Sequence, residues 1–180
     1  MTMSTDEILQ RVANHESLEN EHLAGADLTG QDLRGGDFSG ADLTKADLTG
    51  ANLSGCNFRG ADLTNAVLVD CNLSDADLLS VEAPGADFSQ ANMEGAALKE
   101  GNFAGALFVG ASLVDADLTD GDFTGADFSE ASLNGAELTG ADFSQANMVN
   151  ADLTDAEYKD AVFDDANMES VSGYEPTDDY

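Results

Sequence analysis

The protein has 180 residues, and its 36 Asp and Glu against 6 Lys and Arg give a formal net charge of −30. This charge argues against direct binding to nucleic-acid phosphates and to an anionic membrane surface, because both would repel it. No apolar stretch approaches the roughly 20 residues of a membrane span, and the N-terminal stretch MTMSTDEILQ lacks the basic start and apolar core of a signal peptide. We therefore expect a cytoplasmic protein.

Residues 1–22 do not follow the pattern that fills most of the chain. Ser4 followed by Glu7 is typical of a capping box and predicts a short helix that ends near Asn14. The apolar residues of this helix would share one face: Ile8, Leu9 and Val12. Because the first coil of a repeat array has no neighbouring coil on one side, we predict that the helix caps it. A partner-binding helix is the alternative.

Residues 23–171 repeat a five-residue unit, here called a pentad, as in ADLTK at Ala41–Lys45. Its positions are a small residue, an Asp or Asn, a Leu or Phe, often a Ser or Thr, and a variable residue. An α-helix turns about 100° per residue, so this spacing would spread the Leu and Phe residues around its surface. In a straight strand, an odd spacing would send successive Leu and Phe residues to opposite faces. The chain must therefore turn a corner in every pentad.

The spacing within a pentad predicts which side chains form the core. The small residue and the central Leu or Phe lie two apart and would point inward, with the Asp or Asn between them pointing outward. The last two residues would form the corner, where Thr-Gly pairs are frequent. Phenylalanines recur every 20 residues, at Phe103, Phe123, Phe143 and Phe163. Four pentads would then form one coil of an all-β square tube with about seven and a half coils.

The motif A-(D/N)-(L/F)-(S/T)-x, seen at Ala41–Lys45, Ala61–Asn65 and Ala126–Glu130, resembles the pentapeptide-repeat proteins. The resemblance covers residues 22–171 and implies a right-handed quadrilateral β-helix, with no catalytic residues to transfer. The best-known family members with an assigned role resemble B-form DNA in size and charge, and they bind DNA gyrase or protect it from quinolones. Those members are dimers joined through a C-terminal module, and some carry loops that project from the coils.

This sequence departs from those members in two ways. Its repeat region has no insertion, and it ends in SVSGYEPTDDY, a short acidic stretch with little capacity for a dimerising helix. Both departures weaken the prediction that this protein binds DNA gyrase. We predict an N-terminal cap at 1–22, a repeat region at 23–171 and an acidic tail at 172–180.

The placement of the acid distinguishes between two explanations for it. A DNA mimic would concentrate carboxylates where a DNA-binding partner makes contact, whereas adaptation to high salt would place them everywhere. The four predicted sides carry seven, seven, six and eight outward Asp and Glu, so the acid is nearly uniform. Molar salt screens self-repulsion within about 3 Å. We therefore favour a halophilic source over DNA mimicry.

One predicted side carries outward apolar residues, which alternate with polar coils and form a candidate interaction patch: Val67, Val69, Leu107, Val109 and Val149. An apolar patch on a charged rod can mark a contact surface. The alternative is that these mostly β-branched residues only favour extended structure. The patch predicts docking of a partner protein or side-by-side self-association into a weak homodimer.

No catalytic, cofactor or metal site is predicted from the sequence. His15 and His22 lack the spacing of a helical metal site, and the repeat offers no histidine that could act as a general base. Cys56 and Cys71 occupy the small position of their pentads, which predicts buried, reduced thiols rather than zinc ligands. We predict a non-enzymatic protein–protein interaction scaffold without a cofactor, its partner unassigned; the alternative is a DNA mimic that modulates gyrase or another topoisomerase.

The pentad VEAPG at 81–85 is the weakest of the series. Ala83 replaces the inward Leu, and Pro84 lacks an N–H group to donate. These residues predict a local bulge or a thin spot in the core.

Overall fold

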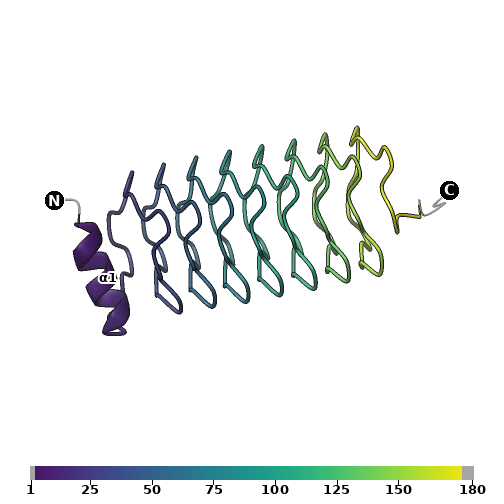
Figure 1. Cartoon of the computed structure of the whole chain (residues 1–180). Coiled ribbons are helices and arrows are strands. Elements are labelled where there is room, and N and C mark those ends of the chain that lie inside the picture. The colour runs from purple at the N-terminus through teal and green to yellow at the C-terminus, as the bar shows by residue number, and fades with distance from the viewer. Residues whose placement is uncertain (1–2, 176–180) are drawn as a thin grey trace.

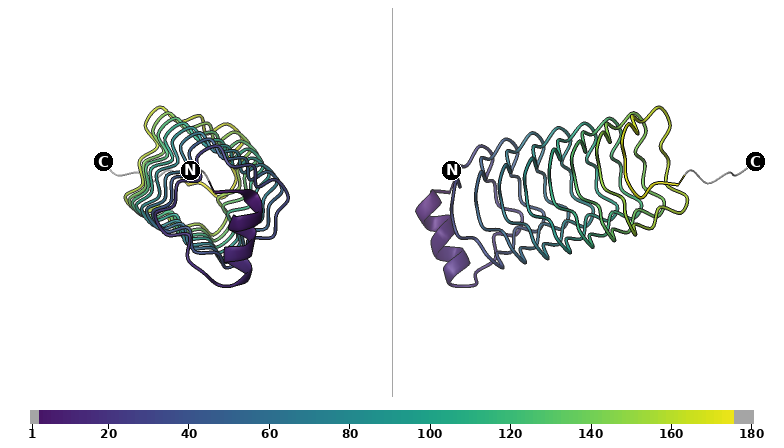
Figure 2. Two further views of the ribbon diagram at one scale, coloured as in Figure 1. Left: turned by 90° about the vertical axis from the view of Figure 1, so that its left-hand side faces the viewer. Right: turned by 45° about the vertical axis from the view of Figure 1, so that its right-hand side comes forward.

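The computed structural model describes residues 3–175, which form a right-handed four-sided β-helix closed at its N-terminal end by helix α1, Thr5–Ala13 (Figure 1). Parallel bridges join residues 20 apart, from His22–Asp42 to Asp152–Ser172. This register confirms four pentads per coil, and the end-on view of Figure 2 shows the four sides in alignment. Over residues 3–175, no helix is long and apolar enough to cross a membrane. The predicted acidic tail lies outside the described residues from 176 onward.

Helix α1 forms as its sequence predicts. The Ser4 hydroxyl accepts a hydrogen bond from the Glu7 N–H at 3.3 Å, and acidic residues occupy the first turn with Arg11 in the last, as the helix dipole favours. Ile8 and Val12 are buried in the same core as the first coils. The predicted cap over the first coil is therefore confirmed, and the helix lies across the end of the tube (Figure 2).

Residues 16–20, which lie in the predicted cap, share the geometry of a pentad. Leu18 is fully buried, and its N–H donates to the Asp37 carbonyl at 2.8 Å, as central residues do in later coils. Asn20 has a φ of 57°, which places it in the corner position. The pattern is hard to see here because Ser17 stands where later pentads carry Asp or Asn.

Each pentad folds as the spacing predicts. Small and central residues are buried without exception from Ala41 to Leu153. The small residue of the next pentad donates its N–H to the central carbonyl, as from Ala46 to Leu43 at 3.0 Å. The fifth residue has a positive φ, 57° at Lys45, as a type II turn requires at its third position. The corner therefore accepts Gly, Asn and Asp most readily.

The Phe residues stack along the tube axis in successive coils. The rings of Phe108 and Phe128 lie 4.6 Å apart and within 7° of parallel, and Phe103 stacks on Phe123 at 5.1 Å. Neighbouring columns meet edge to face, as between Phe123 and Phe128 at 5.5 Å. Each Phe therefore stacks on a Phe of the next coil, which confirms the 20-residue coil.

The second position of the pentad has a structural role beyond solvation. From Asp27 to Asn167, the Oδ1 of every Asp and Asn in this position accepts a hydrogen bond from the N–H two residues later, at 2.8 to 3.5 Å. Asn57 also donates to Asp37 of the neighbouring coil at 2.9 Å. The side chain thus completes each turn in the manner of an Asx turn. Much of the acid therefore serves the corners of the fold.

The predicted bulge at 81–85 is absent. The bridges from Glu82 to both neighbouring coils keep their register, and the Ala83 N–H donates to the next coil at 2.7 Å. Pro84 occupies the fourth position, whose N–H elsewhere donates to an Asp side chain and takes no part in the ladder. Val81 is fully buried in the small position, so its larger side chain offsets the small Ala83.

Candidate functional site

The predicted apolar patch lies on one side of the rod, in two positions of the pentad. Val67 and Leu107 take the second position, and Val69, Val109 and Val149 take the fourth. Leu107 is 40 % exposed, while the four valines are half-buried. Asp87 bridges to both Val67 and Leu107, so an acid separates the two apolar coils. The patch is two apolar pairs and a single valine, separated by coils that carry carboxylates at Asp87 and Asp127.

Leu107 and Val67 cannot form the side-chain hydrogen bond with which Asp or Asn completes the turn. Neither side chain can accept the N–H two residues later, although Asp87 between them does so for Ser89 at 2.9 Å. A hydrogen bond of this kind contributes roughly 0.5–1.5 kcal/mol. The apolar residues are therefore not explained by the stability of their own corners.

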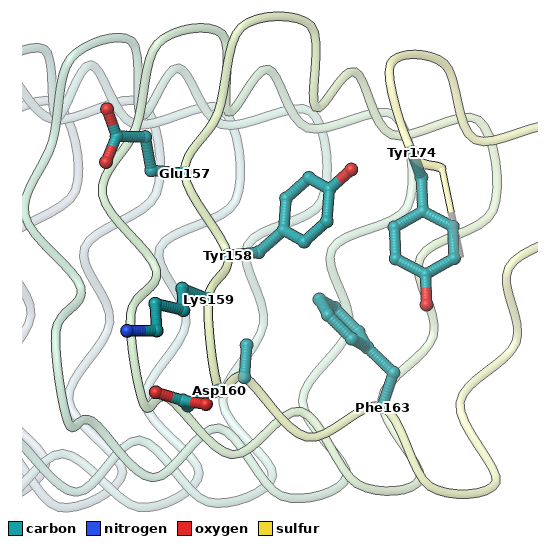
Figure 3. Close-up of a pocket in the computed structure, with 7 residues that line it drawn as sticks. Glu157, Tyr158, Lys159, Asp160, Phe163 and Tyr174 are labelled. Atoms are coloured by element: carbon teal, nitrogen blue, oxygen red, sulfur yellow. The ribbon is translucent and has the colours of Figure 1, made fainter. Parts of the chain in front are cut away.

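A second surface, at the C-terminal end of the tube, was not predicted. From Ala156 onward the inward residues change from buried to half-buried, and these are Ala156, Tyr158, Ala161, Phe163, Ala166, Met168 and Val171. A pocket of about 560 Å³ is lined by three of them, Tyr158, Ala161 and Phe163, and by Tyr174. Figure 3 shows these three rings converging, with Glu157 and Lys159 pointing away from them.

Tyr174 partly covers this pocket. Its ring centroid lies 5.4 Å from that of Tyr158 and 5.2 Å from that of Phe163. The Tyr158 hydroxyl accepts from the Glu175 N–H at 3.1 Å, which ties the segment after the last coil to the tube. One sequence signal was present here, because Tyr158 is the one tyrosine among the central residues.

The C-terminal surface is strongly acidic. Residues 155–175 contain seven Asp and Glu against one Lys, a net charge of −6. Glu157, Lys159 and Asp160 line the pocket beside the aromatic residues. The charged residues that line the pocket are thus two carboxylates and one ammonium group.

Two cysteines and Asp152 are held in protonation states that do not favour catalysis. Burial raises the pKa of both Cys56 and Cys71 to about 12, so they remain thiols, and Cys56 Sγ donates to the Leu33 carbonyl at 3.0 Å. The Thr154 hydroxyl and N–H hold the pKa of Asp152 below its usual value, so this carboxylate is a poor general acid. Within residues 3–175, no three or more His, Cys, Asp or Glu gather to hold a metal ion.

Comparison with known proteins identifies the class of this repeat. The family model for pentapeptide repeats matches eight copies, over residues 22–60, 56–95, 86–125 and 122–157. The chain therefore belongs to the pentapeptide-repeat family. No match was found among the curated proteins.

One of the solved structures similar to this chain supports the fold with a TM-score above 0.5. A trypsin-treated variant of QnrB1, a plasmid-mediated fluoroquinolone resistance protein, is 23 % identical over 88 % of this chain and 87 % of its own, with a TM-score of 0.56. HetL, a protein involved in heterocyst differentiation regulation in the cyanobacterium Nostoc sp. strain PCC 7120, is 26 % identical over 94 % of this chain and 96 % of its own, with a TM-score of 0.46. A pentapeptide-repeat protein of the Arabidopsis thaliana thylakoid lumen is 32 % identical over 65 % and 71 %, with a TM-score of 0.37.

Proposed function

We propose that this protein is a non-enzymatic rod that docks a protein partner along the side carrying Leu107, Val109 and Val67. The observation that carries the proposal is Leu107, which is 40 % exposed in a position where most pentads use Asp or Asn to complete the turn. Exposed apolar side chains on a highly charged rod are stabilised by a partner that removes them from water.

Aspartate substitutions provide a sharp test, because an Asp in the second position can accept the vacant turn N–H. Leu107→Asp combined with Val67→Asp should leave the rod folded and abolish partner binding, measured by crosslinking and co-purification from the native host at its own salt. Val162→Asp is a matched control, because Val162 is 38 % exposed in the same pentad position on another side. If the double variant keeps its partners and its oligomeric state, the proposal fails.

A second candidate function, DNA mimicry, is favoured by the charge along the rod. Residues 22–171 carry 28 Asp and Glu against 5 Lys and Arg, a net charge of −23. With about 4.8 Å between coils, this corresponds to one net charge per ~1.6 Å of axis. Double-stranded DNA carries one per ~1.7 Å, distributed around all sides of the duplex. Uniform acid therefore also suits a protein that competes with DNA.

The DNA-mimic function predicts inhibition of an enzyme with a DNA-binding groove, such as DNA gyrase. The test is a supercoiling assay with the gyrase of the native host, in which inhibition at near-stoichiometric protein supports mimicry. Leu107→Asp with Val67→Asp should leave this inhibition intact, because it adds acid to the rod. Absence of inhibition at a large excess would reject this second function.

A further inference from the structure

The side of the rod that carries the candidate interaction patch differs from the other three in its cations. Its pentads recur every 20 residues from 26–30 to 166–170, and they contain seven Asp and Glu but no Lys, Arg or His. All the Lys and Arg of residues 22–171 lie on the other three sides, at Arg34, Lys45, Arg59, Lys99 and Lys159. Charge complementarity therefore favours a cationic partner on this side.

Acidic and apolar side chains alternate along the second pentad position of this side. Parallel bridges connect one residue of each successive coil, in the order Asp47, Val67, Asp87, Leu107 and Asp127. With about 4.8 Å between coils, the apolar residues lie ~9.6 Å apart and a carboxylate lies midway between them. A segment that matches this side therefore presents apolar and cationic side chains alternately on one face.

The three carboxylates of this column each retain an oxygen for a partner. Their Oδ1 atoms accept the turn N–H, at 3.0 Å for Asp47, 2.9 Å for Asp87 and 2.8 Å for Asp127. Across residues 3–175, no hydrogen bond or salt bridge reaches their Oδ2 atoms, whereas Asp32 on another side is paired with Arg34. These Oδ2 atoms are therefore available to a Lys or Arg from outside the chain.

An α-helix presents side chains at the spacing of these coils. Residues at i, i+3 or i+4, and i+7 share one face, and seven residues span ~10.5 Å of the helix axis. A crossing angle of about 25° to the rod axis reduces this length to the ~9.6 Å between apolar coils. Each helical turn then faces one coil, so that apolar residues at i and i+7 meet Val67 and Leu107 while a cation between them meets Asp87.

Other occupants fit this side less well. An extended strand repeats one face every ~6.6 Å, which matches neither the spacing of the coils nor that of the apolar residues. A polyproline II helix repeats every ~9.3 Å and matches the apolar residues, but it presents no side chain to the carboxylate midway between them. A second copy of the chain docked through this side would bring the same seven carboxylates and no cation.

We propose that this side of the rod binds a basic amphipathic α-helix of a partner protein. Apolar residues of the helix contact Val67 and Leu107, and its Lys or Arg side chains pair with Asp47, Asp87 and Asp127. A helix of about 15 residues spans these five coils. The inference rests on the proposed function, because it uses the same side of the rod, and it adds the secondary structure and the charge of the partner.

The test measures binding of a fluorescent, Ala-based peptide of about 15 residues to the full chain by fluorescence anisotropy. The peptide carries two Leu residues seven apart, with one Lys a helical turn before them, one between them and one after them, all on one face. We expect saturable binding. A peptide of the same composition with its lysines on the opposite face, and one with a central Pro that breaks the helix, should each bind at least tenfold more weakly.

Variants of the protein distinguish this site from general attraction to an acidic rod. Leu107→Asp with Val67→Asp adds acid, which would tighten a purely electrostatic complex, whereas loss of the apolar contacts should weaken binding at least tenfold. Asp87→Asn keeps a side-chain acceptor for the turn and should weaken binding about fivefold. Asp142→Asn is the matched control, because Asp142 takes the same pentad position on another side and accepts its turn N–H at 2.8 Å. It should leave binding unchanged.

Circular dichroism shows whether each variant remains folded. Absence of saturable binding, equal binding of the peptide with its lysines on the opposite face, or binding insensitive to Asp87→Asn would overturn the inference. If the double variant loses its host partner but the helical peptide does not bind, this inference fails and the proposed function stands. If the double variant keeps its host partner while the peptide shows the expected losses, the proposed function fails and this inference stands.

Discussion

The two ends of the rod differ in how their inward apolar residues are covered. At the N-terminal end, α1 covers the first coil, and Ile8 and Leu18 are fully buried. At the C-terminal end, Phe163 and Met168 remain half-buried, and Tyr174 supplies one ring where a further coil would pack. Because each coil of a solenoid buries its face on its neighbours, inward residues that stay half-buried lack the packing that such a neighbour supplies.

The largest expected effect concerns salt, and it should separate the two ends. With a net charge of −30, removal of salt strengthens self-repulsion throughout the rod. We expect a lower melting temperature in millimolar than in molar KCl, with amide exchange in residues 155–175 rising first. An unchanged melting temperature would reject salt adaptation, and simultaneous loss of protection at both ends would contradict the difference between them.

Removing the anchor of the cap should have the next largest effect. Ile8 is fully buried, so Ile8→Ala should lower the free energy of unfolding by about 3 kcal/mol. Met168→Ala at the other end should cost about 1 kcal/mol, because that side chain is already half-exposed. Urea denaturation of the two variants tests this contrast. Equal losses would mean that the C-terminal coil is as well covered as the first.

A smaller effect is expected for Tyr174→Ala. The aromatic contacts with Tyr158 and Phe163 should contribute about 1 kcal/mol to ordering of the last coil. Hydrogen exchange should report faster opening from residue 156 onward, while protection near Leu18 and Leu23 is unchanged. Faster exchange along the whole rod would instead indicate that the two ends unfold as one cooperative unit.

Much of the fold could be predicted from the sequence, because inward and outward positions follow from spacing alone. The interval between Phe103 and Phe123 gave the number of sides, and the small position of Cys56 gave its burial. What spacing could not give is the hydrogen bonding of outward groups. The Asp42 side chain points outward as predicted, yet it accepts the Thr44 N–H at 3.1 Å and so forms part of the corner.

The same limit explains the error at Pro84 and the missed C-terminal surface. A missing N–H group disturbs the coils only where that group takes part in the hydrogen bonds between coils. The N–H group of the fourth pentad position does not take part in them. The half-buried C-terminal surface was missed because Tyr158, Phe163 and Met168 follow the core pattern, which predicts that they point inward and does not show how deeply they are buried. The candidate interaction patch was found because its outward apolar residues depart from that pattern, and its role stays a prediction.

The smallest effect should come from pH, through carboxylates that tie each end to the tube. The Ser17 hydroxyl donates to Asp37 at 2.6 Å and holds its pKa below the usual value; Thr154 and, less strongly, Ser172 do the same for Asp152. A lowered folded pKa gives stability that is present above the unfolded value, near 3.9, and is lost as pH falls through the folded value.

Asp37→Asn and Asp152→Asn should therefore each lower the free energy of unfolding by about 0.5 kcal/mol at pH 6, since both groups are near the surface. The difference from the unmodified chain should shrink below pH 4 and vanish once both states are protonated. Asp164→Asn, exposed in the last coil, is the control for the Asp-to-Asn change itself at pH 6. Paired urea titrations from pH 6 to pH 3 provide the measurement. A loss of unfolding free energy that persists at low pH would mean that the Asp37 and Asp152 side chains stabilise the two ends by their shape rather than by their charge.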